Sequence, residues 1–157
     1  MMHQLLSINL LSCLNSRQFH TKVRSYKRIG PHNLDVISVL VGCLLGDAVK
    51  SKSVVQSTSF RFRQSARHKD YFFFLYDFFF TRGYCTDSGP RQYKTILINA
   101  SNVKKTHYGY EFDVLTFSSL NWLYDLFYVD RIKIISPELI NYLTPMALAF
   151  LIMDAGG

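Results

Sequence analysis

Apolar residues gather in a few stretches that are separated by polar ones, and the longest of these stretches predict buried helices. The predicted helices span residues 34–46, 70–81, 120–128 and a last segment that begins at Pro145. The second helix is rich in phenylalanine, and these side chains are expected in the core.

Shorter stretches of β-branched and aromatic residues predict strands. They span residues 49–55, 58–64, 92–99 and 110–117. A turn at Gln56-Ser57 joins the first pair, and a polar loop over residues 102–109 joins the second. The order of helix, strand pair, helix, strand pair and helix predicts an α+β fold with two antiparallel hairpins.

Several residues match the positions where helices begin and end. Asn33, Ser119 and Thr144 are predicted to cap the amino ends of helices, and Pro145 occupies a first helical position. Gly83 follows the phenylalanine-rich helix, where a left-handed residue commonly ends a helix.

The strand near residue 60 has two different faces. Side chains alternate along a strand, so Phe60 and Phe62 point to one side and Arg61 and Arg63 to the other. One face is therefore predicted to pack against the core, and the other is cationic.

Positive charge is unevenly distributed in this chain of net charge +7. No Asp or Glu precedes Asp35, and residues 1–30 resemble either a mitochondrial presequence or a basic leader, with a disordered basic tail as the alternative. Two further stretches without acids, 48–69 and 88–110, favour a polyanionic partner, although a solvated surface would have the same composition.

Neither a structural metal nor a membrane span is expected. Cys13, Cys43 and Cys85 lie far apart and lack the spacing of a zinc site. The longest apolar runs, residues 36–46 and 71–80, are too short to cross a bilayer.

The carboxyl end of the first helix combines two glycines with an acid. Gly42 and Gly46 each cost about 1 kcal/mol in a helix relative to alanine, so their spacing predicts close packing against another helix. Asp47 faces the negative end of the helix dipole, which is unfavourable unless a cation lies nearby. Asp47 is therefore a candidate metal ligand, with a solvated acid at a frayed helix end as the alternative.

The last helix repeats this arrangement, because an apolar run ends in Asp154, Ala155 and glycine. Residues 35–48 and 143–157 resemble the two signature helices of LAGLIDADG homing endonucleases and their intron-maturase relatives. Residues 82–84, 116–124 and 139–145 are similar to the subgroup encoded in mitochondrial group I introns. The resemblance divides the chain into a leader (1–30), a first half-domain (31–143) and the start of a second signature helix (144–157).

The resemblance implies the LAGLIDADG homing-endonuclease fold, in which two signature helices pack together and an antiparallel strand saddle lies on DNA. Here that fold would be truncated after the second signature helix. Gly42, Gly46 and Ala149 would lie at the helix interface. Asp47 would be the catalytic acid and a Mg2+ ligand. Asp154 is a weaker ligand candidate, because Ala155 occupies the usual position of the second acid.

The saddle would be formed by the predicted strands, and basic and polar side chains on these strands and in the loop over residues 102–109 are the candidate nucleic-acid contacts. These are Lys50, Lys52, Arg61, Arg63, Gln64, Lys94 and Lys104. Phosphate contact is the commonest role for such residues, and arginine can also bind guanine in the major groove. A basic edge strand that discourages aggregation is the alternative.

Three functions remain open from the sequence. The first is a site-specific endonuclease that cuts double-stranded DNA in the mitochondrion. The second is a maturase that binds group I intron RNA and needs no intact active site, which Ala155 favours. The third is a split or degenerate protein that requires a missing carboxyl-terminal half.

Overall fold

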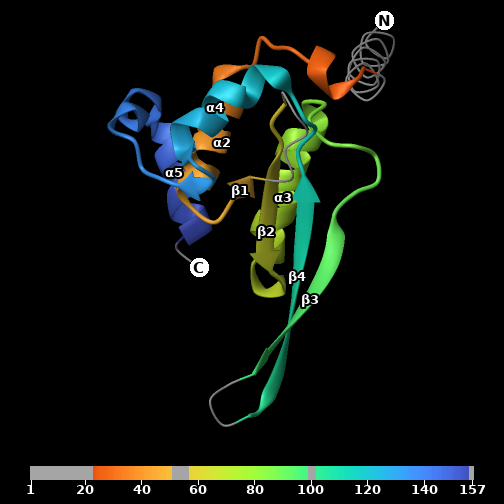
Figure 1. Cartoon of the computed structure of the whole chain (residues 1–157). Coiled ribbons are helices and arrows are strands. Elements are labelled where there is room, and N and C mark those ends of the chain that lie inside the picture. The colour runs from red at the N-terminus through yellow and green to blue at the C-terminus, as the bar shows by residue number, and fades with distance from the viewer. Residues whose placement is uncertain (1–22, 51–56, 99–101, 156–157) are drawn as a thin grey trace, which may run out of the picture.

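The computed structural model describes residues 23–50, 57–98 and 102–155 and confirms the α+β fold (Figure 1). The helices are α2 (Leu34–Leu45), α3 (Lys69–Thr81), α4 (Asn121–Phe127) and α5 (Pro145–Ala155). The strands are β1 (Val49–Lys50), β2 (Phe60–Ser65), β3 (Arg91–Ile98), β4 (Lys104–Asp113), β5 (Tyr128–Val129) and β6 (Ile132–Lys133). Short 3-10 helices span Ser25–Lys27, Ala66–His68, Ser118–Leu120 and Pro137–Tyr142.

Four antiparallel strands form the main sheet in the order β1-β2-β4-β3, which confirms both predicted strand pairs. Helix α3 covers one face of the sheet, where Phe62 stacks on Phe112 with ring centroids 4.8 Å apart. Phe79 of α3 packs onto Phe62 at 5.1 Å. The predicted split of the 60–63 segment into an apolar and a cationic face is thus confirmed on its apolar side.

The second hairpin is longer than the sequence predicts. Strand β4 begins at Lys104, so most of the expected polar loop at residues 102–109 is strand. Within β4, only residues 109–113 pair with β2, and residues 104–108 pair with β3 alone. We call this two-stranded extension, residues 94–98 and 104–108, the distal hairpin; Figure 1 shows it reaching beyond the helices. Residues 104–107 are polar although they form part of β4, so polarity is a poor signal for a loop here.

Two of the three predicted amino-terminal caps are wrong. The side chain of Asn33 makes no capping hydrogen bond. Ser119 lies within a 3-10 helix, and its Oγ instead accepts a hydrogen bond from the Gly30 amide at 2.9 Å. Thr144 does cap α5, because its Oγ1 accepts from the Ala147 amide at 3.1 Å. Gly83 has the predicted left-handed conformation, with φ of 79°.

The phenylalanines of α3 are only partly in the core. Phe72 and Phe79 are fully buried, whereas Phe74 is 55% exposed and Phe73 is also exposed. A helix presents one face to the sheet, so a continuous aromatic run must also point outward. Phe74 stacks on Phe150 of α5 with centroids 6.2 Å apart. None of the described helices is long and apolar enough to cross a membrane.

Helices α2 and α5 pack directly against each other, with two glycines at the contact. A Cβ placed on Gly42 would collide with the carbonyl oxygen of Ala147 and approach the Phe150 Cβ to 3.0 Å. A Cβ on Gly46 would collide with the carboxylate of Asp154. This close approach also requires a small side chain on α5, and Ala147, which is fully buried, provides it. Ala149, expected at this interface, is exposed, because two residues along a helix rotate a side chain by about 200°.

This packing gives a first prediction, on Gly42→Ala. Alanine is the better helix former by about 1 kcal/mol, so propensity alone would stabilise the variant. The clash with Ala147 should reverse the sign and cost about 1–3 kcal/mol, as overpacking does. Urea unfolding measures the change, with Ala149→Leu on the exposed face of α5 as the control. A Gly42→Ala variant as stable as the parent chain would show that the helices do not approach this closely.

Candidate functional site

The carboxyl ends of α2 and α5 bring Asp47 and Asp154 together. The backbone amide of Asp47 donates a hydrogen bond of 2.6 Å to Asp154 Oδ2. Gln64 of β2 donates from Nε2 to Asp154 Oδ1 at 2.8 Å. Asp154 is buried, whereas Asp47 is exposed at the helix end. The two acids therefore have different surroundings although they are neighbours.

Asp154 has the environment of a structural carboxylate. Burial raises its pKa, and the hydrogen bonds from Asp47 and Gln64 oppose that rise only in part. Each of its two oxygens accepts a hydrogen bond from the protein. These contacts hold together the ends of α2, α5 and β2. Ala155, the last residue of α5, follows it at the position where the family resemblance expects an acid.

Lys133 supplies the cation that an acid at a helix carboxyl end requires. Its Nζ donates hydrogen bonds to the carbonyl oxygens of Gly46 at 2.9 Å and Ala48 at 3.2 Å, on either side of Asp47. Burial lowers its pKa, while the negative charges of Asp47 and Asp154 oppose this change. The sequence gives no sign of this contact of Lys133, because β6 lies far from α2 along the chain and the residues around Lys133 show no pattern that indicates it.

A cleft of about 430 Å³ extends from Asp47 and Asp154 at the helix ends to the sheet. Its lining includes Asp47 and Asp154 from the helix ends, Arg63 and Gln64 from β2, and Tyr93 from β3. His68 also contributes to the wall. A group bound over the sheet would thus lie next to the exposed carboxylate.

The sheet face opposite α3 carries a network of ion pairs. Strand register places the members of this network on one side of the sheet, which we call the open face: Arg61, Arg63, Arg91, Glu111 and Asp113. Tyr93 lies on the same side. Arg61 Nε lies 2.8 Å from Asp113 Oδ1, and Arg63 Nε lies 2.7 Å from Glu111 Oε2. The hydrogen bond with Asp113, together with its charge and that of Glu111, raises the pKa of Arg61 against the effect of burial.

Among the described side chains, three further predicted nucleic-acid contacts, Gln64, Lys94 and Lys104, do not share this face. Gln64 is buried on the phenylalanine side, as strict alternation from Phe60 and Phe62 requires. Lys94 and Lys104 are exposed in the distal hairpin, but register places them on the same side as Gln64. Lys50 ends β1 in register with Phe60, and Lys52 lies outside the described residues. Lys105, which the prediction omitted, is exposed on the side of Arg61 and Arg63.

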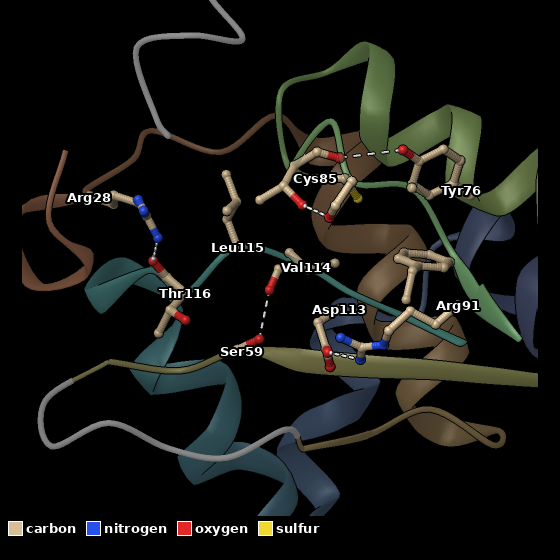
Figure 2. A pocket seen from close by; sticks show the side chains of 13 residues that line it. Arg28, Ser59, Tyr76, Cys85, Arg91, Asp113, Val114, Leu115 and Thr116 are labelled. Atoms are coloured by element: carbon tan, nitrogen blue, oxygen red, sulfur yellow. Dashed lines mark hydrogen bonds and ion pairs between the residues drawn. The ribbon is translucent and has the colours of Figure 1, made fainter. Parts of the chain in front are cut away.

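A second pocket, of about 300 Å³, lies where β4 ends and shares no lining residue with the Asp47 cleft (Figure 2). Its polar groups bond within the protein, since Ser59 Oγ donates to the Val114 carbonyl at 2.6 Å and Tyr76 donates to the Thr86 carbonyl at 3.4 Å. Burial raises the pKa of Cys85 to about 12, so its thiol stays protonated near neutral pH. This pocket offers no activated nucleophile.

The described residues do not form a complete metal site. Among residues 23–50, 57–98 and 102–155, no three His, Cys, Asp or Glu side chains are grouped to hold a cation. Asp47 could give one carboxylate, whereas Asp154 is buried and each of its oxygens already accepts one hydrogen bond from the protein. The Mg2+ site that the family resemblance implies therefore fits this chain only in part.

Comparison with known proteins matches the chain to one family. The model of the LAGLIDADG DNA endonuclease family covers residues 37–157. The chain is 32% identical over 135 residues to cytochrome b mRNA maturase bI2 of Saccharomyces cerevisiae, covering 82% of this chain and 31% of the relative. It is 42% identical over 84 residues to intron-encoded endonuclease ai4 of Dictyostelium discoideum, covering 53% of this chain and 52% of the relative.

A solved structure has a similar fold. The homing endonuclease I-WcaI, bound to its DNA recognition sequence, matches with a TM-score of 0.61 and 24% identity. The match covers 78% of this chain and 51% of that one. The chain thus spans about half the length of I-WcaI and of the Dictyostelium relative, and less of the yeast maturase.

The contacts of Asp154 give a second prediction. Asp154→Ala would leave the Asp47 amide and the Gln64 amide without an acceptor, at a cost of about 1–3 kcal/mol. Asp154→Asn keeps an oxygen for Asp47, and Gln64 can turn its amide to accept from the new NH2 group. Urea unfolding should therefore show a clear loss for the alanine variant and a smaller one for asparagine. Equal losses would mean that the negative charge itself holds the helix ends together.

Proposed function

Because the chain belongs to the LAGLIDADG DNA endonuclease family, we propose that it forms the first half of an intron-encoded homing endonuclease. Such an enzyme hydrolyses phosphodiester bonds at a specific site in double-stranded DNA. One observation carries the proposal: the cleft at the end of α2 joins the exposed Asp47 to Arg63 and Tyr93 of the open face. A duplex lying on that face would place a phosphate next to Asp47.

The parts of the site have separate roles in this proposal. Arg63 and Lys105, which share the open side of the sheet, bind the duplex, and Asp47 serves as the acid at the scissile phosphate. Lys133 fixes the backbone on both sides of Asp47 and so orients its carboxylate. Mg2+, when bound, would activate water and neutralise charge on the phosphate. This chain offers Asp47 as one ligand, and Ala155 stands where the family resemblance expects the second carboxylate, so little or no cutting is expected from the chain as it stands.

Intron-RNA maturation is the second candidate function. Three observations favour it: each oxygen of Asp154 already accepts a hydrogen bond within the protein, Ala155 stands at the expected acid position, and the chain is similar to a cytochrome b mRNA maturase. Binding of RNA would use the same basic hairpin and need no metal. Either function is proposed to act in the mitochondrion, where group I introns of this kind are expressed.

Salt dependence tests whether the chain is a nucleic-acid binder. About four lysine or arginine contacts to phosphate would lower the affinity for duplex DNA roughly a hundredfold between 50 and 200 mM salt. Fluorescence anisotropy with a labelled duplex measures this slope, and the intron RNA of the same gene serves as competitor. Tighter binding to that RNA than to any duplex would support the maturase instead. An affinity that does not change with salt would contradict both functions.

A metal titration tests the assignment of the acids. Ala155→Asp should add a second carboxylate beside Asp47 and raise the affinity for Mn2+, a paramagnetic substitute for Mg2+, at least tenfold. Adding Asp47→Asn should remove this gain, because an amide is a poorer ligand for a hard cation. Electron paramagnetic resonance of free Mn2+ gives the affinity without any need for activity. If Ala155→Asp alone had no effect, or if Asp47→Asn left the gain intact, Asp47 would not be the ligand.

A further inference from the structure

The three arginines of the sheet are held by two carboxylates of β4. Arg61 binds Asp113 through Nε at 2.8 Å and Nη2 at 3.1 Å. Arg91 Nη2 reaches Glu111 at 3.2 Å and Asp113 at 2.8 Å; Figure 2 shows the pair of Arg91 and Asp113. Arg63 contacts Glu111 through Nε at 2.7 Å. The network carries one net positive charge, because three arginines face two acids.

The carboxylates lie beneath the arginines. The side chain of Glu111 is 12% exposed, whereas those of Arg63 and Arg91 are 51% and 59% exposed. Burial alone would raise the pKa of Glu111, but the hydrogen bond from Arg63 and the charges of the three arginines outweigh it and lower the pKa. Glu111 is therefore a fixed anion at neutral pH that supports guanidinium groups turned toward the solvent.

Arg63 differs from the other two arginines because neither of its terminal nitrogens bonds within the described part of the chain. Its ion pair uses Nε. Its guanidinium carbon lies 5.1 Å from the centre of the Tyr93 ring. That ring lies close against Gly109, where a Cβ would come within 2.6 Å of it. Glu111 and Tyr93 thus hold Arg63 from two sides and leave a pair of N–H donors exposed.

The distal hairpin has the opposite character. Lys94, Lys104 and Lys105 are exposed, and within the described part of the chain none lies within 4.0 Å of a carboxylate. Flexible, unneutralised lysines suit phosphate, whose binding depends on counterion release. A guanidinium that is held by a carboxylate binds phosphate less strongly, because the negative charge of the carboxylate repels the phosphate. A guanidinium held in this way favours a base edge that accepts two parallel hydrogen bonds, as guanine O6 and N7 do.

We propose that Glu111 is a positioning residue that presents Arg63 to a guanine in the major groove of duplex DNA. Arg63 on the open face then reads sequence, while Lys105, on the same side of the distal hairpin, supplies affinity that depends on salt. This division rests on the proposed function, because it requires duplex DNA on the sheet. It goes further by assigning specificity to one arginine and its carboxylate support.

Selection from a random-sequence duplex pool, followed by sequencing, tests the division. The parent chain should enrich a guanine at one position by roughly five- to a hundredfold over other bases, the range of one good bidentate contact. Glu111→Gln should reduce that preference several-fold and at the same time raise the affinity for unselected duplex, because it removes a negative charge. A merely structural role would weaken both. Arg63→Lys should lose the guanine preference, since lysine lacks the planar fork of donors.

Lys105→Gln is the matched variant in the distal hairpin. It should keep the guanine preference and reduce the slope of log affinity against log salt by about one. Melting curves of every variant check that the fold is retained. If the parent chain binds duplex DNA with a steep salt slope but Glu111→Gln keeps the full guanine preference, the positioning role is wrong. If the parent chain binds no duplex, or only RNA, the proposed function fails first.

Discussion

The close approach of α2 and α5 is the constraint on which the rest of the structure depends. Gly42 and Gly46 leave no room for side chains between the helices, so the ends of both helices meet. This brings the buried carboxylate of Asp154 against the backbone of Asp47. Asp47 is then left exposed, with Lys133 bonded to the carbonyl groups around it. A helix end that is electrostatically unfavourable for an acid is thereby stabilised within the fold.

The sheet extends this site in two directions with different electrostatics. Near the helices, Glu111 and Asp113 neutralise most of the arginine charge and fix the direction of the side chains. Farther out, β3 and β4 continue as a two-stranded hairpin whose lysines have no such partners among the described residues. Net charge alone would treat both regions as one basic surface. The sheet therefore has one region whose arginines are held in ion pairs and a second, the distal hairpin, whose lysines have no ion pair among the described residues.

Local patterns in the sequence predicted those features that neighbouring residues determine. The glycine pair indicated a close helix contact, and alternation placed Phe62 in the core. The same alternation could have placed Gln64 there, because it is two residues beyond Phe62. Lys133 could not be predicted, since its partners on α2 are distant in sequence. Residues 104–108 of the distal hairpin were taken for a loop because this part of β4 lacks the run of apolar residues that identifies a strand.

The central claim is that the end of α2 lies against the backbone of a duplex bound on the open face. It can be measured by attaching an iron–EDTA chelate at Asp47→Cys, with Cys13 replaced by serine; Cys43 and Cys85 are buried. The chelate cuts whichever nucleotides are nearest to it on a bound, selected duplex. Cuts limited to a few adjacent nucleotides inside the protected footprint are the expected result. Cuts outside the footprint, or spread evenly along it, would contradict the claim.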